Sequence, residues 1–395
     1  MRTFICFLLI AVVGFALLAD AGNSSAPMIY WDANATAMET ASATNGGGTG
    51  SWDDATGDWW AGGAADGAWT SNGVAYFGGK PGKVTLNASE SVSGLVFAAP
   101  GYCLGNIDGT SALTLMGHDP FIKVPGGMTT IGCDLVCGDD GAELTVTGAG
   151  QLVLTEAITF AGGITIKNIT LALGKGGSIS HAASITLDGA VWDVSRYSPY
   201  CVAATTAFRA RAAGIEGNIR IDGPVTLDYA PGGSAGDSNH PALCVAQGSL
   251  TLGHSGLIVN NTTGVALGLG VYSLIQVPGG DILRSAGSLV VTGSGIAPGT
   301  SASVSVSGHS LNLVVGPLEI FAPAISSVAW AGNSLVLSGV NGPAGGTFRV
   351  LTSTNLSAPF SNWTVIATDV FSQAGTFRVT NSDSISPSYF IIRVP

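Results

Sequence analysis

The chain has 395 residues, of which 10% are charged and 58 are glycine, and its formal net charge is −11. Nucleic acids and anionic membrane surfaces attract basic proteins, so this charge argues against both as partners. Low charge together with abundant Gly, Thr, Ser and Val favours short strands and turns over helices, and we expect an all-β protein.

The first 21 residues have the pattern of a secretory signal peptide. Arg2 precedes the apolar run FICFLLIAVVGFALL, and Ala19, Asp20 and Ala21 form a small-x-small cleavage pattern. The run is shorter than the roughly 20 residues that span a bilayer, which disfavours the alternative of a membrane anchor. We expect an exported protein, secreted or associated with the cell surface, whose mature chain has no transmembrane segment.

Residues 22–79 are predicted to form a Trp-rich N-terminal cap that covers the open end of a solenoid with large aromatic side chains. The segment contains five of the eight tryptophans, Trp31, Trp52, Trp59, Trp60 and Trp69, interleaved with aspartates that include Asp32, Asp53, Asp54 and Asp58. An exposed aromatic platform for sugar rings is an alternative. The aspartates lack the regular spacing of a calcium-binding loop, so we predict no metal there.

A short module of an apolar residue, Thr and a second apolar residue recurs from residue 80 to 317, in KVTLN, ALTLM, ELTVT, GITIK, SITLD, PVTLD and SLTLG. In a strand the two apolar side chains point into the interior and the Thr points outward, where stacked Thr side chains can interact. We expect one coil per module and roughly ten coils. The interval of 40 residues between Ile185 and Val225 indicates an insertion or a skipped coil.

This interval carries a basic cluster, and its sequence AATTAFRARAAG is a candidate for a short helix. The cluster consists of Arg196, Arg209, Arg211 and Arg220. A lateral loop of this kind could bind a ligand, although dispersed arginines more commonly form a solvated surface. Both interpretations remain open at this stage.

Five cysteines follow the signal peptide: Cys103, Cys133, Cys137, Cys201 and Cys244. An odd number leaves at least one thiol unpaired within the chain and weakens a disulfide framework, and the pairing among them stays open. In one extended strand Cys133 and Cys137 would share a face about 13 Å apart, beyond disulfide reach, and we expect both to be buried thiols.

Residues 318–395 are predicted to form a small antiparallel β-sandwich. Their strands are longer, the sequence GTFRV occurs at both 346–350 and 375–379, and turns such as NGPAGG and SQAG separate the apolar runs.

The segment GAGQLVLTEAITFAGGITIKNITLALG, residues 148–174, resembles the repeat of bacterial secreted proteins that carry autotransporter-associated β-strand repeats. The Trp-rich start and the segment LVLSGVNGPAGGTFRVLTSTNL resemble other parts of such proteins. The resemblance implies a right-handed parallel β-helix, export, and a location at or beyond the cell surface, without an established activity. About 70 C-terminal residues are too few for an eight-stranded membrane barrel, so we expect no autotransporter barrel.

We predict no catalytic, cofactor-binding or metal-binding residues. Asp188, Asp222 and Asp228 follow predicted strands singly, and the five histidines occur mostly in turn contexts without forming a close pair. The expected function is a structural or adhesion-type scaffold without enzymatic activity, with glycans, extracellular matrix or cell-envelope components as partners. The alternative is a polysaccharide-binding or polysaccharide-degrading β-helix protein, which requires Asp and Arg side chains to converge in a lateral groove beside exposed Trp or Tyr.

Overall fold

The computed structural model describes residues 26–33, 46–62, 65–107, 109–139, 141–253, 256–285, 287–318, 322–381 and 389–394. The expected signal peptide lies outside the described residues. The chain divides into two compact units, Met1–Gly316 and Pro317–Pro395. Apart from one turn of 3₁₀ helix, Phe360–Asn362, the regular elements of the described residues are strands, which confirms the all-β prediction. Among those residues we find no helix with the length and apolar character needed to span a membrane.

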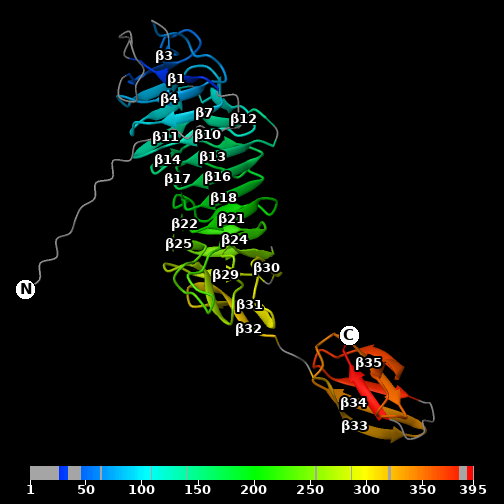
Figure 1. Cartoon of the computed structure of the whole chain (residues 1–395). Coiled ribbons are helices and arrows are strands. Elements are labelled where there is room, and N and C mark those ends of the chain that lie inside the picture. Colours follow the sequence, from blue (N-terminus) through cyan, green and yellow to red (C-terminus); the bar gives the residue numbers. More distant parts are fainter. Residues whose placement is uncertain are drawn as a thin grey trace, which may run out of the picture. The chain divides into compact units, whose positions relative to one another are not determined.

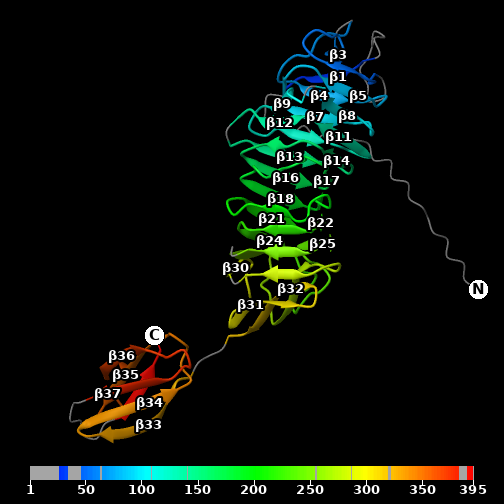
Figure 2. The same ribbon diagram turned by 180° about the vertical axis from the view of Figure 1, so that it is seen from behind.

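The first unit is built from stacked coils that contribute strands to two long sheets (Figures 1 and 2). The first long sheet has the order β3 (Trp59–Trp60), β1 (Met28–Trp31), β4 (Val74–Phe77), β7 (Gly94–Phe97), β10 (Phe121–Lys123), β13 (Glu143–Thr147), β16 (Gly163–Lys167), β18 (Ser184–Asp188), β21 (Ala207–Arg211), β24 (Val225–Tyr229), β27 (Leu257–Asn261) and β30 (Leu289–Gly293). From β1 to β30 neighbouring strands pair in parallel, as successive coils of a solenoid do.

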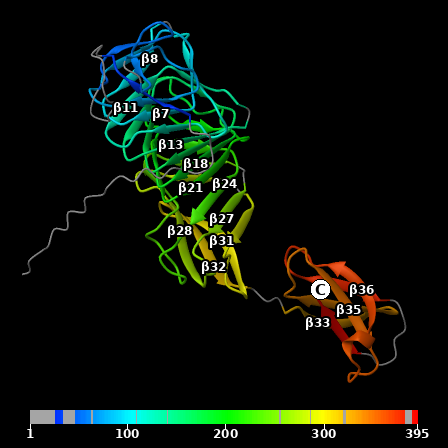
Figure 3. The same cartoon turned by 45° about the horizontal axis from the view of Figure 1, so that its top comes forward.

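The second long sheet runs in the same chain direction and ends in an antiparallel hairpin, which Figure 3 shows at the lower end of the stack. Its order is β2 (Gly50–Trp52), β5 (Lys83–Leu86), β8 (Cys103–Asn106), β11 (Met128–Gly132), β14 (Gln151–Leu154), β17 (Thr170–Leu173), β19 (Val191–Asp193), β22 (Ala213–Glu216), β25 (Leu243–Gln247), β28 (Gly270–Gln276), β32 (Ser310–Pro317) and β31 (Thr300–Ser307).

Two four-stranded parallel sheets complete the coils on a third side. One has the order β15 (Ile158–Thr159), β12 (Asp134–Cys137), β9 (Ala112–Leu115) and β6 (Glu90–Val92). The other has the order β20 (Tyr200–Val202), β23 (Ile219–Ile221), β26 (Leu250–Leu252) and β29 (Ile282–Arg284). These parallel sheets confirm the solenoid, while its predicted right hand stays a prediction.

Inward-facing and outward-facing side chains alternate along the strands, and the inward-facing ones form the interior of the stack. In the first long sheet Leu144, Ile164 and Ile185 are register partners and are at most 1% exposed. The intervening Thr145 and Thr165 are also partners, and both are half-buried on the outer face. A single coil has too little apolar surface for a core of its own, so burial depends on the neighbours above and below.

The predicted equivalence of the seven modules is wrong, because they lie in different sheets. KVTLN forms β5 of the second long sheet, ALTLM and SLTLG form β9 and β26 of the third side, and the other four lie in the first long sheet. All these sheets bury alternate residues against one interior, so the same three-residue pattern recurs on each side of a coil. The module spacing therefore does not measure coil length throughout.

The interval between Ile185 and Val225 contains a complete coil. Strand β21 pairs in parallel with both β18 and β24, which makes the skipped coil the correct alternative. The predicted helix in AATTAFRARAAG is wrong, since Phe208 and Ala210 of this segment point into the core and Arg209 points outward. The two-residue alternation of buried and exposed side chains outweighs the helix propensity of the alanines in this segment.

The Trp-rich segment forms a buried cap, as predicted. Trp31, Trp52 and Trp59 are at most 1% exposed and Trp69 is 6% exposed. The ring centroids of Trp59 lie 4.7 Å from those of Trp52 and 4.5 Å from those of Trp69, and Phe77 continues the stack into the coils. These four rings fill the end of the core, so they do not form an exposed platform for sugars.

The five cysteines form no disulfides. The chain leaves β11 and enters β12 at Cys133, so Cys133 and Cys137 do not share one extended strand as predicted. Cys133 is buried, and this burial raises the pKa of its thiol to about 12, whereas Cys137 is only half-buried.

The second unit consists of two three-stranded antiparallel sheets, as predicted. Their orders are β33 (Ala324–Ala331), β34 (Ser334–Val340), β37 (Phe377–Asn381), and β36 (Thr364–Val370), β35 (Thr347–Ser353), β38 (Tyr389–Arg393). The repeated GTFRV places Phe348 and Phe377 in the core with ring centroids 4.9 Å apart, while Arg349 and Arg378 are exposed. The repeat therefore supplies one core aromatic residue to each sheet.

Candidate functional site

Two arginines of the basic cluster, Arg209 and Arg211, belong to a ladder of ion pairs on the outer face of the first long sheet. Lys167, Asp188 and Arg211 are register partners, and Asp188 lies 3.7 Å from the Lys167 Nζ and 3.8 Å from the Arg211 Nε. Arg209 donates two hydrogen bonds to Asp228, of 2.6 and 2.8 Å. Burial alone would raise the pKa of Asp228, but these two bonds and a third from Asn260 lower it below its usual value. The ladder links successive coils.

The other two arginines of the cluster lie elsewhere. Arg220 is on β23, on the third side, and its Nε donates to both oxygens of Asp222. Arg196 lies in the turn after β19. The structure therefore contradicts a single basic loop, since only Arg209 and Arg211 share a strand.

A lateral groove opens at the corner between the two long sheets, where residues 230–242 leave the regular coil between β24 and β25. Its volume is about 460 Å³. The lining comes from two successive coils and the loop: Arg211, Ala212, Ala213, Asp228, Ala230, Asn239, His240, Pro241, Ala242 and Cys244.

A buried carboxylate fixes the imidazole of the groove. The Asp237 side chain is 6% exposed, and its Oδ2 lies 2.8 Å from the Nδ1 of His240. The backbone N–H groups of Gly232 and Asn239 also donate to Asp237. Burial alone would raise the pKa of Asp237, but these three hydrogen bonds together lower it. An ionised Asp237 can only accept in this pair, so the Nδ1–H of His240 donates the hydrogen bond and Nε2 is left for another partner.

Cys244 and Asp228, two other polar side chains of the groove, are not activated for nucleophilic attack. Burial raises the pKa of Cys244, so its thiol stays protonated at neutral pH and is a poor nucleophile. Asp228 is engaged by Arg209 and Asn260. Asp and Arg side chains do converge here, but no Trp or Tyr is among the described residues that line the groove. The full pattern required for the polysaccharide-degrading alternative is therefore not met.

Neither the other aspartates nor the histidines form a metal centre in the part of the chain that the structure describes. That part contains no group of three or more His, Cys, Asp or Glu side chains placed to hold a metal ion. Asp53 accepts hydrogen bonds from Ala55 and Thr56 and so closes its own turn. His254 and Asp140 lie outside the described residues.

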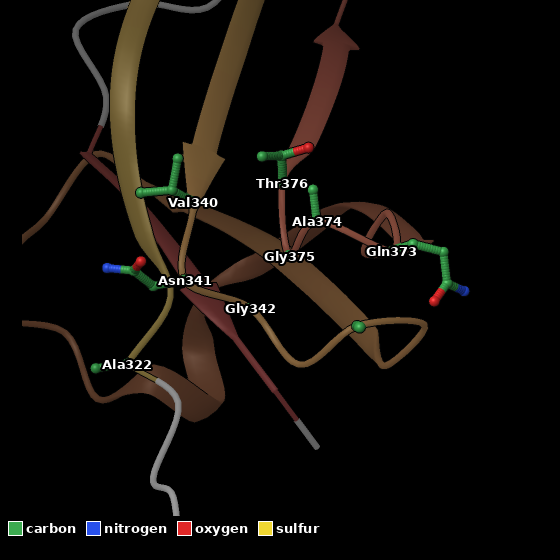
Figure 4. Close-up of a pocket in the computed structure, with 9 residues that line it drawn as sticks. Ala322, Val340, Asn341, Gly342, Gln373, Ala374, Gly375 and Thr376 are labelled. Atoms are coloured by element: carbon green, nitrogen blue, oxygen red, sulfur yellow. The ribbon is translucent and has the colours of Figure 1, made fainter.

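A second hollow, of about 770 Å³, lies within the C-terminal unit at one end of its strands (Figure 4). It is lined largely by backbone and small side chains, including Gly342, Ala374 and Gly375. In Figure 4 the amide groups of Asn341 and Gln373 point away from each other. The hollow therefore does not gather polar groups around one point.

The sequence interpretation noted His240 as a turn residue and did not single out Asp237. The groove depends on residues 211, 228 and 237–244, which only the coil register brings together. A signal was present in the glycine-rich sequence PGGSAGDSNHP, because a polar loop that interrupts a regular coil is where function commonly lies on a rigid scaffold.

The fold and groove define a β-solenoid with a capped N-terminal end and a polar lateral groove. No family model matches the chain, and no solved structure matches it. The chain is 34% identical over 175 residues to a protein described as "Adhesin BmaC autotransporter" from Brucella suis biovar 1 (strain 1330). The match covers 42% of this chain and 5% of the length of that protein.

Proposed function

We propose that this protein is an exported adhesion-type scaffold that works at or beyond the cell surface. The similarity to an adhesin carries this proposal. The long stack of coils supports it, because each coil adds lateral surface to a rigid body on which loops can contact a partner. Glycans, matrix proteins and cell-envelope components are the proposed partners.

A role in binding is favoured over hydrolysis or elimination of a polysaccharide. Cleavage needs an acid and a base that are free to exchange protons with the substrate. Asp228 accepts hydrogen bonds from Arg209 and Asn260, and Asp222 accepts them from Arg220. Glycan binding without cleavage is the second candidate, and the donor-rich groove favours it.

The test is a binding assay with beads that carry residues 22–395. We expect the beads to bind epithelial cells, immobilised matrix proteins or isolated cell envelopes in a saturable manner, with competition by the free protein. Beads that carry only residues 317–395 show whether the C-terminal unit is sufficient. Absence of saturable binding to all three surfaces would contradict the proposed function.

A further inference from the structure

We propose that the lateral groove binds a carboxylate-bearing sugar unit of an acidic glycan, with Arg211 as the carboxylate ligand and His240 and Asn239 as hydrogen-bonding partners. This inference rests on the proposed function, since it names one class of partner for the same surface. The groove volume of about 460 Å³ falls within the range of about 300–1,000 Å³ that is typical of small-molecule sites.

Arg211 differs from its neighbouring arginines in how its guanidinium is used. Arg209 and Arg220 each donate two hydrogen bonds to a carboxylate. The Arg211 Nε lies 3.8 Å from Asp188, beyond hydrogen-bonding distance, and 62% of the Arg211 side chain is exposed. Asp188 also lies 3.7 Å from Lys167. Arg211 therefore retains donors in the fork geometry that matches a carboxylate.

The other polar side of the groove is preorganised. Three hydrogen bonds to the buried Asp237 hold His240 and the loop backbone at Gly232 and Asn239 before any ligand arrives. A Cβ at Gly232 would lie 3.0 Å from the His240 Cε1, so the small residue permits this close packing. Such fixed groups lose little conformational entropy on binding, which favours affinity for a small polar ligand.

The composition of the wall favours a sugar over a simple inorganic anion. Small apolar side chains, among them Ala212, Ala230 and Pro241, lie beside the polar groups and can contact the C–H faces of a ring. The chain as a whole has a net charge of −11, which repels polyanions at long range. Affinity for an acidic glycan must therefore come from local contacts in the groove, and it will depend on the position of the carboxylate.

The test is isothermal titration of residues 22–395 with a galacturonate trisaccharide and with its fully methyl-esterified form, which has the same rings without the charges. We expect the acidic trisaccharide to bind and the ester to bind at least about tenfold more weakly, as loss of a charged hydrogen bond predicts. Equal affinity for the two forms, or no binding of the acidic form, would overturn the proposal.

Matched variants locate the site. Arg211→Ala and His240→Ala should each weaken binding of the acidic trisaccharide by about tenfold. Arg220→Ala, which removes an arginine of similar exposure on another face, should leave it unchanged. Thermal unfolding of each variant checks the fold, and equal affinities of Arg211→Ala and the parent protein would refute the assignment. If the parent protein binds cells but not the acidic trisaccharide, this inference alone is refuted. If the parent protein binds none of the three surfaces, the proposed function is refuted.

Discussion

Glu90 is a buried acid in a fold whose acids otherwise lie mostly near the surface. It begins β6, is 5% exposed, and its Oε1 has no hydrogen-bond partner among the described atoms. Burial first, and then the charge of Asp54 with a hydrogen bond to it, raise the pKa of Glu90 to about 7. The folded state therefore favours the protonated form of this side chain.

The first prediction concerns Glu90→Gln, which keeps the shape and removes the charge. Folding raises the pKa of Glu90 from 4.5 to about 7. The stability that the protonated Glu90 side chain contributes is therefore fully present below about pH 4.5 and is lost as the pH rises to about 7. We expect the variant to match the parent protein near pH 4.5 and to be more stable by about 3 kcal/mol at pH 8. Thermal unfolding at both pH values measures this.

The exposed Glu143→Gln is the control for Glu90→Gln, and its stability should follow that of the parent protein at both pH values. A difference between Glu90→Gln and the parent that does not grow with pH would contradict the buried-acid explanation.

The Trp residues of the cap and the Asp237–His240 pair differ in how far the sequence predicts them. Burial of Trp31, Trp52, Trp59 and Trp69 was predictable, because large apolar side chains at the end of a solenoid have a clear place to pack. The hydrogen bond between Asp237 and His240 was not predictable, because it depends on the burial of the Asp237 carboxylate. Composition and residue spacing do not reveal which carboxylate is buried.

At the scale of the element, alternation predicted the strands and their inner faces, but not which sheet each strand joins. In β14 the inward Leu152 is fully buried and the outward Val153 is half-buried, as the pattern indicates. In β21 the alanines made the same alternation hard to recognise in the sequence. Alanine has a high helix propensity, but it can also fill a small core position in a strand. Sheet membership depends on where the chain turns, as at Asn168 with its positive φ of 53°.

The second prediction compares Leu152→Ala with Val153→Ala in the same strand. Leu152 pairs in register with Leu171 inside the stack, so its truncation leaves a cavity and should lower the free energy of unfolding by about 2–5 kcal/mol. Val153 lies on the outer face and its truncation should cost less than about 1 kcal/mol. Denaturant midpoints measure both, and equal losses would refute the inward assignment of Leu152.

On the scale of the whole molecule, the chain contains two separate hydrophobic cores. One runs from Ile29 to Val315 through the coils, and the other lies between the two sheets of the C-terminal unit, around Phe348 and Phe377. The change of strand length and turn composition after Pro317 predicted a distinct C-terminal fold. Each core is formed by described residues of one unit alone.

The third prediction is that the two units unfold independently. Calorimetry of residues 22–395 should show two transitions, and removal of residues 317–395 should leave the transition of the solenoid unchanged. Residues 317–395 expressed alone should retain the other transition. A single transition that shifts when the C-terminal unit is removed would contradict independent folding.

Each of the two long sheets departs from parallel pairing at one of its ends. At one end β3 pairs antiparallel to β1, and at the other β32 pairs antiparallel to β28, with β31 beyond it. A parallel strand of a second copy would meet the wrong polarity at β3, and at the other end the β31–β32 hairpin interrupts the parallel ladder of the second long sheet. These interruptions of the parallel ladder at both ends of the stack discourage head-to-tail stacking of copies into fibrils.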